Sequence, residues 1–274
     1  MLKRRLFSAA IFTCVFLLIN NTAVPVRAEE DDQAARVARW NDIEKAIFGG
    51  RNAAINEDIV KLEAPERVED AALVPIAIRL NVEAPVKGLY IIVDDNPGPI
   101  AAHYLFGPAA DPRLIRMRVR VNSYTNMHAV AELQDGTLVE SVKFVKASGG
   151  CSAPMGISDD EAMQGIGDIR LKLSENVTPG KPAEATLLVR HPNFNGMQMD
   201  LDTHGYTPAR YIRTIDVTDG DKLVFTLKAD ISLSSNPVIS FGFVPQPTGQ
   251  LTIAVDDSDA SHWEKAFVIP TATN

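Results

Sequence analysis

A single thiol in a run of small residues is the feature of this sequence best suited to chemistry. Cys151 follows Gly149 and Gly150 in the stretch Lys-Ala-Ser-Gly-Gly-Cys-Ser-Ala-Pro at residues 146–154. Adjacent glycines resist regular structure because they lose the most conformational entropy on folding, so we expect Gly149 and Gly150 to make the stretch flexible. No large apolar side chain lies between positions 147 and 154 to carry the sulfur into a core. We therefore expect an exposed thiol, against the alternative of an inert, buried cysteine in an interdomain loop.

The setting of this thiol favours carrying an adduct over catalysis. A catalytic nucleophile is normally held rigidly, although spacing alone does not exclude a triad of Cys with His and Asn or Asp. Fully extended, the chain from Ala147 to Cys151 would move the sulfur roughly 13 to 14 Å from an anchored strand end. Lys143 and Lys146 are the nearby cations expected to raise the thiolate fraction.

Other catalytic and metal-binding motifs are missing. The sequence contains no Gly-x-Ser-x-Gly, no phosphate-binding glycine loop and no Cys-x-x-Cys. Its five histidines are scattered, and none are paired at the four-residue spacing of zinc ligands on a helix. The acidic run at 256–259 is interpreted as a solvated turn and not as a calcium loop. We therefore expect no catalytic group, no metal and no cofactor.

The N-terminus has the composition of a cleaved export signal. Basic residues at positions 3–5 precede a mostly apolar run over 6–19, and small residues predict cleavage after Ala28. The run is too short for a membrane span, and no later segment approaches one. Residues 1–28 are thus predicted to be a signal peptide and the protein to be periplasmic, with no membrane partner. Arg4-Arg5 leaves the general and the twin-arginine export routes both open.

Cleavage would leave Cys151 as the one cysteine of the exported chain, because Cys14 lies in the leader. An intramolecular disulfide is then impossible, and an unpaired thiol in an oxidising compartment needs a role. Linkage of two copies through Cys151 stays an alternative. The formal charge of the whole sequence is −8, and the leader takes away basic residues alone. Such an acidic chain is not expected to bind nucleic acid.

The elements that must position the thiol are a helix and two strand-rich blocks. Within residues 29–50, apolar residues mostly three or four apart predict an amphipathic helix that packs Trp40 and Ile47 against the first domain and stops at Gly49-Gly50. A partner-binding helix is the alternative.

The strand-rich blocks cover residues 51–151 and 166–274, and the aperiodic stretch 152–165 is a predicted linker. Arg116, Arg118 and Arg120 alternate with apolar residues, as in a strand with one buried face. The expected fold class is all-β, with two immunoglobulin-like β-sandwich domains in tandem after a short N-terminal helix. The predicted strands lie at 59–62, 73–82, 88–93, 101–105, 114–121, 128–133, 137–145, 168–173, 183–189, 210–217, 222–229, 238–244 and 249–255.

An ordered set of motifs resembles the SoxY and SoxZ sulfur-carrier proteins. The SoxY-like motifs are Ile59-Val60-Lys61-Leu62-Glu63-Ala64-Pro65-Glu66, Val74-Pro75-Ile76-Ala77-Ile78, Asp95-Asn96-Pro97, Val142-Lys143-Phe144-Val145-Lys146 and Gly149-Gly150-Cys151. The SoxZ-like motifs are His191-Pro192, Tyr206-Thr207-Pro208-Ala209-Arg210-Tyr211-Ile212, Gly220-Asp221-Lys222-Leu223-Val224-Phe225, Ser235-Asn236-Pro237 and Val255-Asp256-Asp257. The chain resembles a fused SoxYZ protein, similar to the SoxYZ-like carriers associated with quinoprotein dehydrogenases.

The resemblance implies a SoxY-like sandwich at 51–151 packed on a SoxZ-like sandwich at 166–274. It also implies that Cys151 holds sulfur intermediates covalently, while redox enzymes of a Sox-like or quinoprotein dehydrogenase pathway act on them. The SoxY arm ends its chain with glycines on both sides of the cysteine, whereas here Ser152-Ala153-Pro154 follow and the chain continues. An arm tethered at both ends sweeps less volume, and Pro154 stiffens it. The alternatives are an accessory module of a quinoprotein dehydrogenase that does not use the thiol, and a cysteine-dependent enzyme.

Overall fold

The computed structural model describes residues 33–81, 83–174, 177–200, 203–247 and 249–270. The predicted signal peptide and the first residues of the predicted helical segment lie outside this range. Among the described residues, no helix combines the length and the apolar character that crossing a membrane requires.

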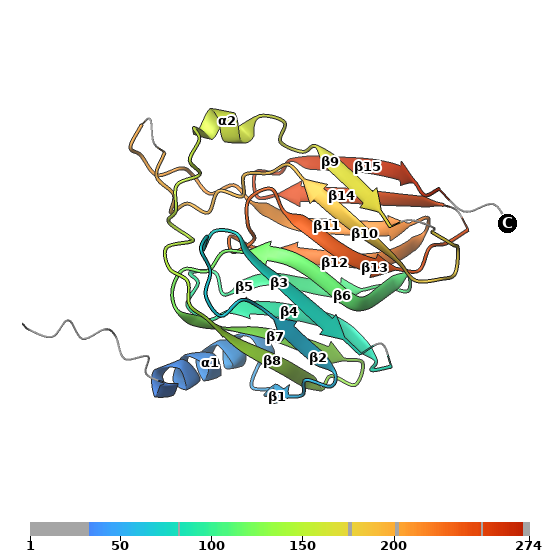
Figure 1. The fold of residues 1–274 in the computed structure, drawn as a ribbon, viewed down its shortest axis with the longest axis horizontal. Helices are drawn as coiled ribbons and strands as arrows, with labels where there is room; N and C mark the ends of the chain where they lie inside the picture. Colours follow the sequence, from blue (N-terminus) through green and yellow to red (C-terminus); the bar gives the residue numbers. More distant parts are fainter. Residues whose placement is uncertain (1–32, 82, 175–176, 201–202, 248, 271–274) are drawn as a thin grey trace, which may run out of the picture. The chain divides into compact units, whose positions relative to one another are not determined.

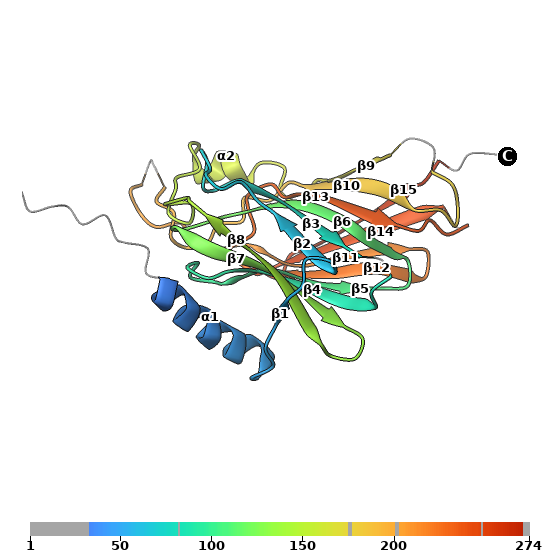
Figure 2. The same ribbon diagram turned by 60° about the horizontal axis from the view of Figure 1, so that its bottom comes forward.

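The N-terminal helix α1 (Gln33–Phe48) packs on the first half of the chain, as predicted. Gly49 and Gly50 end it with φ angles of +65° and +89°, which favour glycine. Its apolar face covers Ile92, Val130 and Leu138, and this face is formed by Trp40, Ile43, Ile47 and Phe48. Figure 2 shows α1 (blue) beside the sheet that contains β7 and β8.

Each predicted strand overlaps an observed one. The first half contains β1 (Ala54–Ile55), β2 (Val60–Glu63), β3 (Val74–Leu80), β4 (Val86–Val93), β5 (Ile100–Phe106), β6 (Ala110–Val119), β7 (Thr125–Leu133) and β8 (Leu138–Val145). The second half contains β9 (Ile169–Leu173), β10 (Ala183–Val189), β11 (Ile212–Asp219), β12 (Lys222–Ala229), β13 (Val238–Phe243), β14 (Gln250–Asp257) and β15 (His262–Val268).

Three short or exposed elements were not predicted. β1 has two residues, and the half-buried face of β15 consists of Trp263, Lys265 and Phe267, so neither strand shows a clear alternation of apolar and polar residues. The predicted linker contains the helix α2 (Asp159–Met163), whose N-cap Ser158 accepts a hydrogen bond from the Glu161 backbone N–H. The stretch 152–165 is therefore partly helical, which its sequence did not indicate.

Both sheets run continuously through the two halves (Figure 1). One sheet has the strand order β1-β8-β7-β4-β5-β12-β11-β14-β15 and the other β2-β3-β6-β13-β10-β9. The halves meet where β5 pairs with β12 and where β6 pairs with β13, both antiparallel. The all-β class with two immunoglobulin-like domains is thus confirmed, and the sandwiches are joined edge to edge by backbone hydrogen bonds.

The apolar core also crosses the seam, by which we mean the pairs β5–β12 and β6–β13 that join the two halves. Inward-facing residues of both sheets form one cluster, including Ile78 and Ile115 of the first half and Val217 of the second. The ring of Tyr104 on β5 lies 5.3 Å from that of Phe225 on β12 in an edge-on arrangement. Since core and sheets are shared, we expect the halves to unfold together.

Gly107 tests the backbone contact at the seam. Its N–H donates to the Val224 carbonyl at 2.9 Å, and a Cβ on it would collide with the backbone of Leu223. We expect Gly107→Ala to lower the free energy of unfolding by about 3 kcal/mol, measured in urea, because the strands must separate. Gly205→Ala is the control, because the nearest atom to its Cβ lies 3.5 Å away. An equal, small effect of both changes would contradict the close contact.

His128 anchors α1 and is expected to make stability depend on pH. Its buried imidazole lies 2.7 Å from Glu140 and 3.3 Å from Asp94, and it stacks on Trp40. Burial lowers the pKa of His128, but the hydrogen bonds to the two carboxylates outweigh it and raise the pKa above 6.5.

The charged form of His128 therefore stabilises the fold below pH 6.5, and this contribution is lost as the pH rises through the raised pKa. We expect the difference in free energy of unfolding between wild type and His128→Gln to shrink across that range. Urea titrations at a series of pH values measure it. A difference that stays constant would show that His128 is not charged in the fold.

Candidate functional site around Cys151

The segment that carries the thiol lies against the end of β6. After β8 the chain runs to Gly149, whose N–H donates to the Asn122 carbonyl at 2.7 Å, and to Gly150, whose N–H donates to the Val121 carbonyl at 3.1 Å. Gly149 has a φ of +78°, and a Cβ on Gly150 would collide with the backbone of Ala71. Both glycines therefore have local structural roles, and the flexibility assigned to them stays a prediction.

The thiol itself is buried, so the expected exposure is wrong for this structure. Cys151 is 1% exposed. Its carbonyl accepts a hydrogen bond from Asn195 Nδ2 at 2.6 Å, and the Ala153 carbonyl accepts one from Gln198 Nε2 at 3.4 Å. Both amide side chains are buried and belong to the second half. The thiol is therefore buried although its neighbours are small, and the backbone around it is held by amides of the second half.

The cation that acts on the thiol is Arg120, which the sequence pattern placed on a strand and did not connect with Cys151. Burial raises the pKa of Cys151, and the Arg120 guanidinium partly offsets this rise. The thiol is therefore protonated at neutral pH. Lys143 and Lys146 instead form ion pairs with Glu57 and Glu66 at 3.3 and 2.8 Å. The expectation that these lysines act on the thiol is wrong.

Arg120 breaks the alternation of the β6 arginines. Arg116 and Arg118 point outward as predicted, but Arg120 is 1% exposed because it follows the last residue of β6 and turns inward. Its guanidinium donates to three backbone carbonyls of the second half, those of Leu233 at 2.6 Å, Ile231 at 3.2 Å and Pro192 at 3.4 Å. Burial lowers its pKa to about 10, so it stays charged at neutral pH.

Turn residues of both halves connect Arg120 to the thiol segment. Asn96 Nδ2 donates to the Arg120 carbonyl at 2.7 Å and to Ser232 Oγ at 2.8 Å, while its Oδ1 accepts from the Asn122 N–H. Asn193 Nδ2 donates to the Ser234 carbonyl at 2.7 Å. These buried polar groups lie at one end of the seam, where each half satisfies donors and acceptors of the other. The SoxY-like motifs include the turn at Asn96. No pattern in the sequence predicted that Arg120 is buried and hydrogen-bonded to the second half.

Arg210 and His191 belong to a separate buried cluster. His191 Nε2 lies 3.5 Å from Asp257 Oδ2, and burial lowers the pKa of His191 to about 4. Asp257 accepts from Arg210 Nε at 2.8 Å and from the backbone N–H groups of Asp259 and Ser261. Asp257 is buried, so the turn at 256–259 is not simply solvated.

Metal ligands do not gather at this site. Within the described part of the chain, no three His, Cys, Asp or Glu residues form a group that could hold a metal ion. The arrangement provides one protonated thiol on which the positive charge of Arg120 acts.

Solved structures give weak likenesses. "Structure of the sulfur carrier protein SoxY from Chlorobium limicola f thiosulfatophilum" is 24% identical, covers 42% of this chain and 96% of its own, and has a TM-score of 0.36. A β-glycosidase from Bacteroides vulgatus is 9% identical over 77% of this chain, with a TM-score of 0.25, and this chain spans about a quarter of that enzyme (24%). At these TM-scores neither likeness supports a conclusion. No curated protein matches the chain.

The family comparison assigns both halves of the chain. The model "Sulfur oxidation protein SoxY" matches residues 44–151 and the model "Sulphur oxidation protein SoxZ" matches residues 169–268. The first match ends at Cys151, and the second begins at the first strand of the second half. The chain therefore belongs to the Sox sulfur-oxidation family as a fused SoxYZ protein, with a SoxY domain followed by a SoxZ domain.

Proposed function

We propose that this protein is a periplasmic carrier that holds a sulfur-containing intermediate covalently on Cys151 and presents it to partner redox enzymes. The observation that carries the proposal is the position of Cys151, which is the last residue of the SoxY match and follows two glycines. The protein does not catalyse the reaction itself in this proposal. The partners belong to a Sox-like or quinoprotein dehydrogenase pathway.

The chemistry of loading explains why the partners must be redox enzymes. Joining the Cys151 sulfur to a thiol-level sulfur forms one S–S bond and releases two protons and two electrons. The chain holds no second cysteine after position 28 to accept those electrons, so the partner enzyme takes them. Arg120 supports this role, because a thiolate and a thiosulfonate are both anionic and the positive charge of Arg120 favours the anionic form of Cys151.

In this proposal, the structure corresponds to a closed state of the carrier in which the thiol is buried. Contacts with Asn195 and Gln198 hold the backbone at 151–153. Exposing the thiol requires these two hydrogen bonds to break, while Gly149 and Gly150 supply the backbone freedom.

A second candidate function follows from the same burial. A thiol that is 1% exposed and has a raised pKa is a poor nucleophile, which favours an accessory module of a quinoprotein dehydrogenase that does not use Cys151. The two candidates differ in whether Cys151 is modified in the cell.

Removing a hydrogen bond that holds the thiol segment closed should speed the alkylation of Cys151. We expect Asn195→Ala to increase the rate of iodoacetamide labelling about tenfold, because the variant loses one buried hydrogen bond to the thiol segment. Intact-mass spectrometry follows the labelling. Asn52→Ala, at an exposed position, is the control and should label at the wild-type rate. Equal rates for all three proteins would mean that the Asn195 contact does not hold the segment closed.

Cargo on Cys151 is tested directly in protein isolated from its native cells. We expect intact-mass spectra to show adducts of one or more sulfur atoms, or of thiosulfonate, that disappear with reductant and are absent from Cys151→Ser. Sulfur oxidation in the cells should fall with the same substitution. An unmodified thiol together with full activity of Cys151→Ser would reject the carrier, and co-purification of a dehydrogenase with that variant would then support the accessory module.

A further inference from the structure

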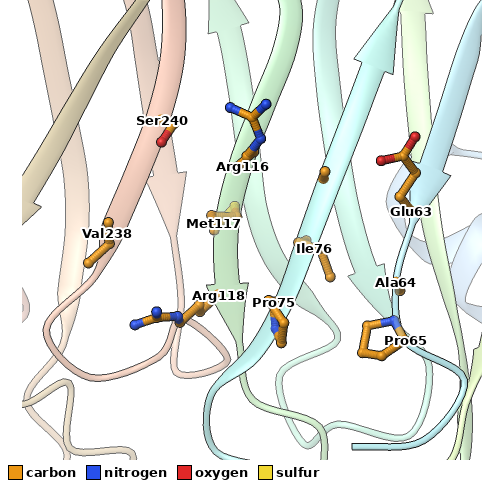
Figure 3. Close-up of a pocket in the computed structure, with 11 residues that line it drawn as sticks. Glu63, Ala64, Pro65, Pro75, Ile76, Arg116, Met117, Arg118, Val238 and Ser240 are labelled. Atoms are coloured by element: carbon orange, nitrogen blue, oxygen red, sulfur yellow. The ribbon is translucent and has the colours of Figure 1, made fainter. Parts of the chain in front are cut away.

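The outer face of the six-stranded sheet contains a groove that lies across the seam. Its volume is about 460 Å³, and its lining comes from β2, β3, β6 and β13, so both halves contribute. Figure 3 shows Arg116 and Arg118 on β6, with Pro75 on one side and Val238 and Ser240 on the other. The groove forms because small side chains on the two neighbouring strands flank the long arginines.

The strand register aligns one row of side chains across this face. The outward residues of neighbouring strands pair directly, which places one residue of each strand in the row. The row consists of Glu63, Ala77, Arg116, Ser240, Thr186 and Lys172. Because backbone pairing sets these positions, the two halves present one surface and not two.

This face carries the opposite charge to the chain as a whole. The formal charge of the sequence is −8. Outward positions of the six strands nevertheless hold more basic than acidic residues. The basic residues are Lys61, Arg79, Arg116, Arg118, Arg170 and Lys172, and the acidic ones are Glu63 and Glu184.

The two arginines in the groove are only lightly engaged within the protein. Arg116 lies 3.6 Å from Glu184, and both side chains are about half exposed, so water screens the pair. Arg118 is exposed and forms no ion pair with another residue that the structure describes. Arg118 can therefore bind a carboxylate of another molecule, and Arg116 can do so by exchanging its weak, exposed pair with Glu184.

The groove also leads toward the thiol. Arg118 lies three residues before Val121, whose carbonyl accepts the hydrogen bond from Gly150, so a strand rise of about 3.3 Å per residue puts the segment about 10 Å further along. At the same end, the Glu66 carbonyl next to Pro65 accepts from the Lys146 N–H at 2.8 Å. A molecule in the groove would lie beside the chain that leads to Cys151.

We propose that this groove docks an acidic segment of a partner protein, with apolar residues between its carboxylates. Arg116 and Arg118 bind the carboxylates, and Pro75 and Val238 contact the apolar residues. The identification of this partner as the enzyme that acts on Cys151 rests on the proposed function. The docking itself requires no thiol.

The test uses the full chain carrying Cys151→Ser, so that thiol chemistry does not enter. The probe is a fluorescein-labelled synthetic peptide of Asp-Leu-Glu-Ser repeats, and its Asn-Leu-Gln-Ser counterpart is the uncharged comparison. We expect anisotropy titrations to show binding of the acidic peptide alone, weakening as sodium chloride is added. Arg116→Glu with Arg118→Glu should weaken it by about tenfold or more.

A matched charge reversal controls for the change in net charge. Arg213→Glu with Lys228→Glu alters two exposed residues of the other sheet and should bind the peptide within about twofold of the parent. If the reversed groove variant does not fold, Arg116→Gln with Arg118→Gln replaces it, with the same direction of change.

Three results would overturn the proposal. Equal affinities of the groove variant and the control variant would exclude the groove as the binding site. Competition by free glutamate as strong as that by the peptide would indicate a small-anion site. Self-association in ultracentrifugation that the groove variant abolishes would assign the face to a second copy of this chain. Peptide binding without cargo on Cys151 would support the docking and reject only the carrier.

Discussion

Backbone hydrogen bonds between β5 and β12 and between β6 and β13 join the two halves into continuous sheets, and the other features of the molecule depend on this seam. A separate SoxY-like sandwich would expose the open edges of β5 and β6, which are costly to leave unpaired. Pairing with the second half removes both edges. The same pairing places Tyr104 beside Phe225 and brings the turns of the two halves together around Cys151.

The seam also makes a buried charge tolerable. Arg120 enters the interior from the first half, and its hydrogen bonds end on three carbonyls of the second half. A buried guanidinium without such acceptors would be strongly unfavourable. The second half therefore stabilises the cation that acts on the thiol, so the electrostatics of Cys151 belong to the fused molecule and not to the SoxY domain alone.

Fusion of the two domains changes what the thiol segment can do. The segment continues through Pro154 and α2 into β9, so it is anchored at both ends. Asn195 and Gln198 bind its backbone and leave the side chain of Cys151 out of the hydrogen bonding. The carrier and the accessory module are both compatible with this geometry. They differ in how readily the hydrogen bonds from Asn195 and Gln198 to the backbone at 151–153 break.

The sequence by itself determined the strands, the helix, its packing through Trp40 and the pairing of a SoxY-like with a SoxZ-like half. Short-range periodicity and turn residues specify the strands and the helix, because each depends on neighbours a few positions away. The SoxY-like and SoxZ-like halves were identified instead by the resemblance of their ordered motifs. It did not identify β1 or α2, which are too short for a period, or β15, in which the exposed Lys265 lies between the half-buried Trp263 and Phe267.

Only the tertiary structure decided that Cys151 is buried, that Arg120 turns inward and that one row of outward side chains, which includes Arg116, crosses six strands. Each of these depends on residues far apart in the chain: the Asn195 amide that donates to the Cys151 carbonyl, the carbonyls of residues 231 and 233 around Arg120, and the register of β6 on β13. The glycines and small residues near Cys151 predicted an exposed thiol, because local composition indicates only how flexible the segment is. Burial depends on which distant residues pack against the segment in the folded chain.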